Sequence, residues 1–252
     1  MIIALVTGAT SGLGRAFLEE WAARGTHFDE VWLVARHADA LAQTAAMLPW
    51  PARTFAIDLS RAEERAQLFA ALTNVQPQVQ AVVNAAGYGK IGPVSAIDAG
   101  EQTGMVELNC AALVDVTQRV LPYMARGGVI FEIASVAAFL PQPGFAVYAA
   151  TKAFVLSFSR ALNAEEKRRG VRVVAVCPNP MHTAFFARAG EKPSLFKLLF
   201  FEEPRDVARA AMRDVVRGRD VSTNCRMASM IRLSAKLLPH RVIIRLERIL
   251  MR

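Results

Sequence analysis

The stretch MIIALVTGATSGLGRAF, residues 1–17, decides the fold. Ile2–Val6 is an unbroken apolar run of the kind that forms a buried strand, and a glycine-rich turn and a helix-favouring segment follow it. A strand, a glycine turn and a helix N-terminus in this order can hold a pyrophosphate, because glycine lets the backbone approach the ligand closely. The spacing is Gly-x-x-x-Gly-x-Gly rather than Gly-x-Gly-x-x-Gly. The residues expected to bind a dinucleotide here are Gly8, Thr10, Ser11, Gly12, Leu13 and Gly14.

Five further apolar runs alternate with longer helical segments along the chain. They are Val31–Ala35, Thr54–Ile57, Ala81–Val83, Val129–Ala134 and Val171–Val176. Runs that are apolar on both faces indicate a parallel sheet covered by helices on each side. The chain of 252 residues has 53% hydrophobic residues, so it can bury a sizeable core. The sequence therefore predicts a single α/β domain with a doubly wound parallel sheet, the Rossmann fold.

A residue with useful chemistry follows each apolar run. These residues are Gly8, Arg36, Asp58, Asn84, Ser135 and Pro178. Because ligands of such sheets bind at the carboxyl ends of the strands, we expect one site where these residues meet.

Arg36 bears on the choice of cofactor. The dinucleotide fingerprint expects an acidic residue about twenty positions after the glycines, to bind the ribose 2′-hydroxyl of NAD. Arg36 stands in this region instead, and a guanidinium pairs well with a 2′-phosphate. This favours NADP(H) over NAD(H), the alternative being an exposed arginine at a strand end. Arg15 and His37 are further cations that either assist or are solvated.

The segment SVAAFLPQPGFAVYAATK, residues 135–152, holds the candidate catalytic groups. Tyr148 and Lys152 are four residues apart in a helix-favouring segment, so both project from one face. An ammonium beside a phenol lowers the phenol pKa, which suits Tyr148 for proton transfer at a carbonyl or alcohol oxygen. Ser135 ends a strand-like run and can meet the same oxygen. The alternative is a Tyr/Lys pair on a solvated helix face.

Composition narrows the class of protein. The net charge is +8, and the basic excess is concentrated at the C-terminus, while no nucleic-acid recognition module is present. Cys110, Cys177 and Cys225 lack metal-ligand spacing and are expected to be reduced core thiols. No apolar run is long enough to span a membrane, and the N-terminus has no signal-peptide pattern. We expect a cytoplasmic protein that binds neither nucleic acid nor metal.

Taken together, TGATSGLG, the NAAG at 84–87, Asn109, Ser135 and the pair Tyr148 and Lys152 resemble the short-chain dehydrogenase/reductase family. The resemblance implies that Tyr148 is the general acid in ketone reduction and the base in alcohol oxidation. It implies that Lys152 lowers the pKa of Tyr148 and holds the nicotinamide ribose. Ser135 would stabilise the oxyanion. Asn109 would anchor a water in a proton relay, the alternative being a polar residue that kinks its helix.

The same resemblance assigns further cofactor contacts. It places Asp58 and Leu59 at the adenine and makes the NAAG turn a brace beside the adenosine ribose. It implies that Thr183, after Pro178, contacts the carboxamide. The members of the turn are Asn84, Ala85, Ala86 and Gly87.

Two departures from the family pattern stand near the end of the sheet. Asn179 replaces the usual glycine after Pro178, and asparagine tolerates a positive φ better than most residues. The last strand is reduced to DVSTNC at 220–225, so a short or displaced seventh strand is expected.

The parts of the domain are expected to be a cofactor and catalytic core at 1–183, a substrate lid at 184–204 and a basic amphipathic tail at 231–252. The lid is too apolar for a solvated loop, so it covers the site, a partner or a membrane surface, the alternative being ordinary packing of the lid on the core. Phe139, Leu140 and Phe145 would add apolar wall, which suits an apolar ketone or long acyl substrate. The apolar lid residues are Phe185, Phe186, Leu195, Phe196, Leu198, Leu199, Phe200 and Phe201.

The tail is basic and amphipathic. Such a helix suits an anionic membrane surface, a neighbouring subunit or packing on the lid, and the sequence leaves these three open. Its apolar face would hold Val242, Ile243, Leu246, Ile249 and Leu250, and its basic face Arg241, Arg245, Arg248 and Arg252.

The resulting expectation is an NADP(H)-dependent oxidoreductase that reduces an apolar ketone or oxidises the corresponding alcohol. One alternative is a 3-oxoacyl-[acyl-carrier-protein] reductase, since a basic surface suits an acidic carrier. Another is a non-catalytic NADP(H)-binding sensor or interaction protein. The family resemblance also implies a homodimer or homotetramer.

Overall fold

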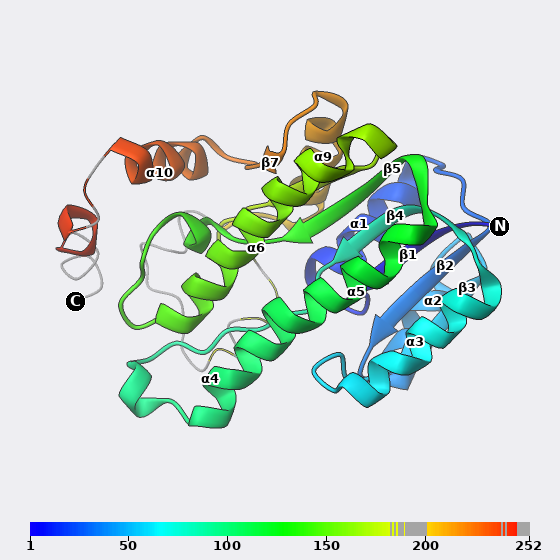
Figure 1. The fold of residues 1–252 in the computed structure, drawn as a ribbon, viewed down its shortest axis with the longest axis horizontal. Coiled ribbons are helices and arrows are strands. Elements are labelled where there is room, and N and C mark those ends of the chain that lie inside the picture. The colour runs from blue at the N-terminus through cyan, green and yellow to red at the C-terminus, as the bar shows by residue number, and fades with distance from the viewer. Residues whose placement is uncertain are drawn as a thin grey trace.

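The computed structural model describes residues 1–181, 183, 185, 189, 201–237, 239 and 241–245. This part of the chain forms one parallel sheet of seven strands in the order β3-β2-β1-β4-β5-β6-β7, with helices on both faces (Figure 1). The predicted doubly wound fold is confirmed, and each of the six predicted strands is present. The strands are β1 (Ile2–Thr7), β2 (Glu30–Ala35), β3 (Ala52–Ala56), β4 (Gln78–Asn84), β5 (Met124–Ile133), β6 (Arg172–Val176) and β7 (Val221–Ser222).

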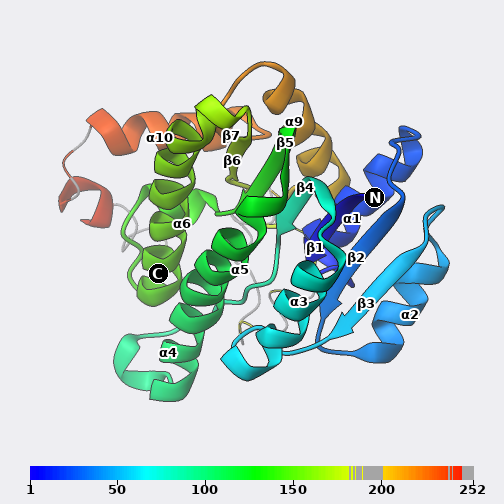
Figure 2. The ribbon, with the colours of Figure 1, turned by 45° about the vertical axis from the view of Figure 1, so that its right-hand side comes forward.

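Two helical layers cover the sheet. One core cluster joins the sheet to α1 (Gly12–Ala23), α2 (Ala38–Ala46) and α9 (Pro204–Val216). A second cluster joins the opposite face to α3 (Ala62–Val75), α5 (Ala112–Val120) and α6 (Ala146–Glu165). Figure 2 shows α3, α5 and α6 side by side in front of the sheet. The helix α4 (Ala99–Val106) precedes α5.

The central strand β1 explains why the apolar runs lack alternation. Ile3 and Leu5 pack into the layer of α3, α5 and α6, whereas Ala4 and Val6 pack into the layer of α1, α2 and α9. Both faces of the strand are buried, so every position must be apolar. The chain continues from β1 to β2 on one side, and β4 lies on the other. This reversal of strand order opens a crevice at the carboxyl end of β1.

The last strand of the sheet is short, as predicted. β7 has two residues, and Val221 pairs with Ala175 of β6. After it, α10 (Arg226–Leu237) extends away from the sheet toward the upper left of Figure 1. No helix in the described ranges is both long enough and apolar enough to cross a membrane.

Substitution of Gly14 by alanine is expected to destabilise the protein. Gly14 lies in the first turn of α1, and a Cβ there would meet the carbonyl oxygen of Gly8 and lie 2.9 Å from its carbonyl carbon. Overpacking against backbone costs about 1 to 3 kcal/mol, more than the ~1 kcal/mol that alanine gains over glycine in a helix. We expect a lower midpoint of denaturant unfolding. An unchanged or higher midpoint would mean that helix propensity decides and that the contact with Gly8 does not.

Candidate active site

A cavity of about 440 Å³ lies at the carboxyl edge of the sheet and collects most of the predicted site. The predicted residues that line it are Gly8, Thr10, Ser11, Gly12, Leu13, Arg36, Asp58, Leu59, Ala85, Ala86, Gly87, Ser135, Tyr148, Lys152, Pro178 and Thr183. Three other predicted residues, Gly14, Asn84 and Asn109, do not line the described cavity. The structure therefore brings most of the predicted residues to one cavity, and these three lie outside its lining.

The glycine turn has a backbone suited to an anion. Gly8 and Gly12 have φ values of +64° and +54°, which favour glycine. Ser11 precedes α1 in an extended conformation, and its hydroxyl makes no capping hydrogen bond to the described helix, whose first turn has no acidic residue. The amides at the start of α1 are thus available to a phosphate. These residues fit the pyrophosphate of a dinucleotide.

The part of the cavity after β2 and β3 is charged. Arg36 is exposed beside His37 and acts electrostatically on Asp58. Burial raises the pKa of Asp58, but hydrogen bonds from Ser60 and the charges of Arg36 and Arg61 outweigh it and lower the pKa overall. Asp58 Oδ1 accepts from Ser60 N at 2.9 Å and Ser60 Oγ at 2.7 Å. An anion bound here would therefore face Arg36 while Asp58 is held by its own loop.

Arg15, another candidate cation for the cofactor, forms an ion pair on the surface of α1 instead. Its Nε donates to Glu19 Oε1 at 2.8 Å, one turn further along α1. Arg15 does not line the described cavity, whereas Arg36 and His37 do. The structure thus supports the interpretation of Arg15 as a solvated surface residue that does not assist cofactor binding.

The predicted catalytic residues come from β5 and α6. Tyr148 and Lys152 lie one turn apart on α6, both buried, and Ser135 follows β5. A side-chain hydrogen bond links Ser135 and Tyr148, and Lys152 Nζ lies 5.7 Å from the centre of the tyrosine ring. The structure thus brings the three groups together at one wall of the cavity, as predicted from their separate motifs.

The expected lowering of the Tyr148 pKa by Lys152 is not what the structure shows. Burial raises the pKa of Tyr148 to about 12, with only the hydrogen bond from Ser135 acting against it. Lys152 Nζ instead donates to Ile133 O at 2.6 Å, so its charge faces a backbone carbonyl. Burial also lowers the pKa of Lys152 to about 8. Tyr148 is therefore a neutral phenol across physiological pH, able to donate a proton.

Asn109 is fully buried in a π-helical turn, Glu107–Ala111, between α4 and α5. Its Oδ1 accepts from Tyr88 N at 3.1 Å, and its Nδ2 donates to Tyr88 O at 2.9 Å and Thr151 Oγ1 at 3.1 Å. These bonds tie the loop after β4 to α6. Such turns are frequent at functional sites. Here Asn109 positions the neighbours of Tyr148 and Lys152 from below the cavity.

Asn84 is also structural. It ends β4, and its Nδ2 donates to Thr117 Oγ1 at 2.9 Å and Glu132 Oε1 at 3.1 Å, beneath the sheet edge. Its amide therefore braces β4 against β5 and α5 rather than contacting a ligand. This agrees with the bracing role that the NAAG turn was expected to have.

Aromatic side chains form an apolar wall over Tyr148. The Phe145 ring stacks on the Tyr148 ring at 4.2 Å between centres, and Phe185 lies 5.3 Å from the same ring. Both phenylalanines line the cavity, but Phe139 does not and packs against the core near α6 instead. Leu140 does not line the described cavity either.

Most of the predicted lid lies outside the described residues. Phe185 is described and covers the site, and Phe201 is described just before α9. The lid residues outside the described ranges are Phe186, Leu195, Phe196, Leu198, Leu199 and Phe200.

Asn179 does not use the left-handed conformation that its replacement of glycine suggested. Gln76 is the one non-glycine residue with positive φ in the described ranges. Asn179 precedes Pro180, which favours an extended backbone. Its backbone N donates to Glu202 Oε2 at 2.9 Å and its Nδ2 to Cys225 Sγ at 2.7 Å. Asn179 thus joins the turn after β6 to the segments before α9 and α10.

The cysteines divide into two kinds. Cys110 and Cys177 are buried, as predicted for core thiols, whereas Cys225, between β7 and α10, is partly exposed and does not fit that prediction. All three are free thiols.

Sequence reasoning missed several residues of the site. Gly89 allows the loop after β4 to approach the catalytic wall, since a Cβ there would lie 2.8 Å from the Tyr148 ring and 2.9 Å from the Phe145 ring. Gln142, which lies between Ser135 and Tyr148 in the sequence, is a further polar residue that lines the cavity. The glycine two residues after the NAAG turn was a usable signal for Gly89. Nothing in a single sequence distinguishes Gln142 from a solvated loop residue.

The fold and the cavity define a doubly wound α/β protein with a glycine loop for a dinucleotide and a serine, a tyrosine and a lysine at one wall. Residues 2–194 match the short chain dehydrogenase family, so the chain belongs to this family of oxidoreductases, as its motifs indicated.

Two curated relatives show how broad the family is. The very-long-chain 3-oxoacyl-CoA reductase of Laccaria bicolor is 37% identical over 180 residues, which are 68% of this chain and 52% of that enzyme. The chain therefore spans about half the length of that relative. The sulfoacetaldehyde reductase 2 of Chromohalobacter salexigens is 34% identical over 189 residues, 73% of this chain and 74% of that protein.

Solved structures agree with this assignment. A short-chain dehydrogenase from Sphingobium yanoikuyae in complex with NADPH is 31% identical with a TM-score of 0.79, covering 88% of this chain and 87% of that one. A 3-ketoacyl-(acyl-carrier-protein) reductase from Brucella melitensis complexed with NADH is 26% identical with a TM-score of 0.75, covering 89% of this chain and 97% of that one.

Proposed function

We propose that this protein is an NADP(H)-dependent oxidoreductase that reduces an apolar ketone, or oxidises the corresponding secondary alcohol. The observation that carries the proposal is the single cavity in which the glycine turn, Arg36, Ser135 and Tyr148 meet. The aromatic wall of Phe145 and Phe185 beside Tyr148 favours an apolar substrate over a charged one.

The chain's own residues would act as follows. The α1 amides and Arg36 would hold the dinucleotide, which supplies a hydride to the carbonyl carbon when bound. Ser135 would donate a hydrogen bond to the carbonyl oxygen and stabilise the negative charge that develops there. Tyr148 would transfer its phenolic proton to the same oxygen. Lys152, buried one turn further along α6, would hold the nicotinamide ribose, as the family resemblance implies.

The direct test follows oxidation of reduced nicotinamide across apolar ketones, diketones and 3-oxoacyl thioesters. We expect turnover of at least one apolar ketone with NADPH, and slower turnover of charged analogues of similar size. Tight NADPH binding without turnover of any carbonyl would contradict the enzyme proposal and favour the non-catalytic sensor. Retention of Ser135, Tyr148 and Lys152 at one wall argues for the enzyme.

Arg36→Ala is expected to weaken NADPH binding by about 10- to 100-fold, with little effect on NADH, because one charge-assisted hydrogen bond contributes about 1.5 to 3 kcal/mol. Dissociation constants for both nucleotides, measured by calorimetry, give the preference directly. Arg61→Ala is the matched control, since Arg61 also acts on Asp58 but does not line the described cavity. An unchanged ratio of the two constants in Arg36→Ala would refute the assignment of the 2′-phosphate to Arg36.

A second candidate activity is reduction of a 3-oxoacyl thioester, a special case of the same chemistry. Two relatives support it: the Laccaria bicolor enzyme is named for a very-long-chain 3-oxoacyl-CoA, and the Brucella melitensis structure is a 3-ketoacyl-(acyl-carrier-protein) reductase. Comparison of kcat/KM for a long-chain 3-oxoacyl-CoA, the matching carrier-protein thioester and a simple ketone separates the candidates. A preference for the carrier-protein form would favour the carrier-dependent reductase.

Self-association stays a prediction from the family resemblance. Light scattering of the purified chain distinguishes the expected homodimer or homotetramer from a monomer.

A further inference from the structure

The segment from α10 to Arg245 exposes apolar side chains that the catalytic site does not use. Met230, Leu233 and Leu237 are 66%, 57% and 72% exposed, and their spacing places them on one helical face. Val242 adds a fourth exposed apolar side chain, at 43%. Single exposed apolar residues are ordinary, but several gathered on one terminal segment indicate a contact surface.

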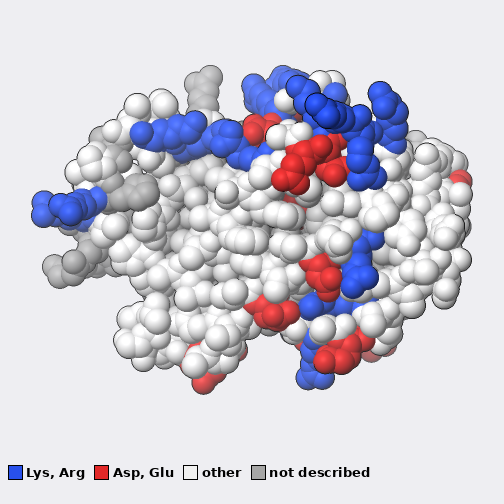
Figure 3. All heavy atoms as spheres, viewed as in Figure 1, with Lys and Arg blue, Asp and Glu red and all other residues white. Residues whose placement is uncertain are grey.

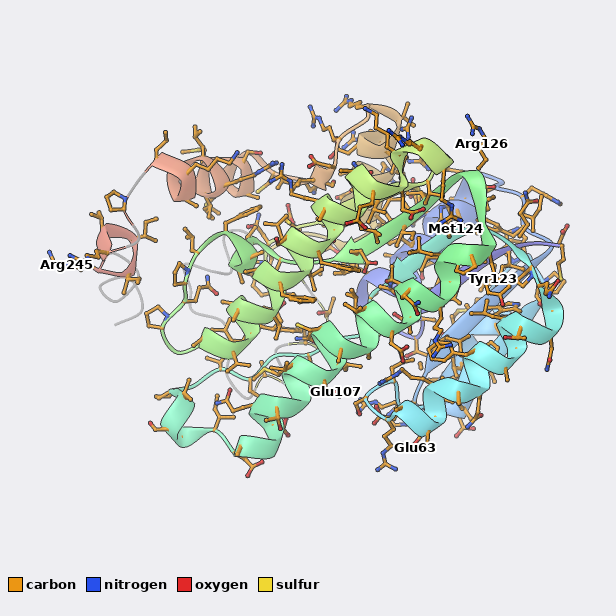
Figure 4. The ribbon with its side chains drawn as sticks, viewed as in Figure 1. Glu63, Glu107, Tyr123, Met124, Arg126 and Arg245 are labelled. Carbon is orange, nitrogen blue, oxygen red and sulfur yellow. The ribbon has the colours of Figure 1, made fainter. Side chains whose placement is uncertain are left out.

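Basic side chains accompany these residues. Lys236, Arg241 and Arg245 are exposed, and the sequence from 226 to 245 has five Lys and Arg and no Asp or Glu. Figure 3 shows Lys and Arg following α10 to the left end of the molecule, and in Figure 4 the labelled Arg245 points away from the body. Arg232 is close enough to the body to act on Asp220. We call the four exposed apolar residues with Lys236, Arg241 and Arg245 the C-terminal surface.

The positive charge of this surface helps to decide whether it binds a second copy of the chain or a lipid membrane. In a symmetric contact with a second copy, the same patch would face itself, so cations would lie opposite cations with no acidic residue of the segment between them. An anionic lipid surface supplies the opposite charge and also accepts exposed apolar side chains. The combination of basic and apolar residues therefore fits a membrane better than a copy of the chain.

The C-terminal surface lies close to the cavity. α10 contacts the short helical turn η4 (Val136–Phe139), and Val136 and Ala137 of that turn line the cavity beside Ser135. We propose that the C-terminal surface docks this protein on anionic lipid, with the cavity near the membrane. Docking on lipid does not depend on the proposed function. Entry of a lipophilic substrate from the lipid into the cavity does rest on the proposed function.

The test is co-sedimentation of the full chain, without substrate, with phosphatidylcholine vesicles that contain or lack phosphatidylglycerol. We expect binding to the anionic vesicles that weakens as salt is raised. Lys236→Glu with Arg241→Glu should weaken binding by about 30-fold or more, since each cation near the surface contributes about a five-fold factor and reversal also adds repulsion. Met230→Ser with Leu233→Ser and Leu237→Ser should weaken it by at least about ten-fold.

The matched control is Val216→Ser with Arg217→Glu, which changes an exposed apolar residue and an adjacent cation at the end of α9. It should bind as the unmodified protein does, and circular dichroism should show that every variant is folded. Absence of binding to anionic vesicles overturns the proposal. Equal binding to both vesicle types also overturns it. A dimer in light scattering that the triple serine variant converts to a monomer would overturn it as well, because it would assign the surface to a second copy of the chain.

Discussion

Tyr148→Phe is expected to lower kcat for carbonyl reduction by about 10²- to 10⁴-fold, the range that a positioned general acid contributes. The substitution removes the hydroxyl and keeps the ring, which packs against Phe145 and Phe185. The aromatic wall and the glycine turn are left in place. Because burial raises the pKa of Tyr148 to about 12, the hydroxyl is protonated throughout the assay range, so the loss should be similar at pH 6 and pH 8.

Steady-state kinetics with the best ketone, together with calorimetric binding of NADPH, test this prediction. The matched control is Tyr123→Phe, because Tyr123 precedes β5 at the opposite edge of the sheet from Ser135 (Figure 4). We expect kcat within about two-fold of the unmodified protein for the control, as for most substitutions away from a site. If Tyr148→Phe retained kcat while binding NADPH normally, another group would have to be the proton donor.

Glu132→Gln is expected to flatten the dependence of stability on pH. Glu132 is fully buried in β5, with Oε1 accepting from Thr117 Oγ1 at 2.8 Å and Asn84 Nδ2 at 3.1 Å. Oε2 has no hydrogen-bond partner among the described residues. Burial raises the pKa of Glu132 to about 7, against the opposing effects of Thr117, Asn84 and Lys152. The neutral acid is therefore the form that the fold prefers.

The direction in which the free energy of unfolding changes with pH follows from the linkage between proton binding and folding. The folded state binds the proton more tightly than the unfolded chain, so the stabilisation is complete below the ordinary glutamate pKa and is lost as pH rises to about 7. Between pH 5 and pH 8 the loss is about 2 to 3 kcal/mol in the free energy of unfolding. Glutamine is neutral at both values, so Glu132→Gln should remove this difference.

Denaturant unfolding at pH 5 and pH 8 measures the effect. The control is Glu63→Gln on the exposed face of α3, where Figure 4 shows the side chain at the edge of the molecule. It should leave the pH dependence as it is. Equal pH dependence in Glu132→Gln and the unmodified protein would mean that Glu132 is ionised in the fold.

The motif residues of the site could be predicted because each acts through its local conformation. The turn at Gly8 and Gly12 requires positive φ, and Tyr148 and Lys152 share a helix face by spacing alone. Predicted strand positions agreed with the structure for the same reason, since burial on both faces demands an unbroken apolar run. The strand ends then met at one edge because all the strands are parallel.

Other properties depend on residues far apart in the chain. The pKa of Tyr148 is raised because distant elements bury it, and Lys152 is turned to Ile133 O by the packing of α6 on β5. The four-residue spacing predicted that Tyr148 and Lys152 are neighbours, but it did not predict which groups surround them. Asn179 likewise contacts Glu202 and Cys225, which sequence position alone does not bring together.

By itself the sequence determined the class of fold, the glycine turn after β1 and the identity of the serine, tyrosine and lysine at the cavity. Periodicity, glycine conformation and helical spacing are local, so they can be read from neighbouring residues. Only the tertiary structure decided that Asn84 and Asn109 act beneath the cavity, that Glu132 is buried with one oxygen unpaired, and which apolar residues of α10 are exposed. Burial and electrostatic environment are set by the packing of elements distant in the chain, and no local pattern encodes them.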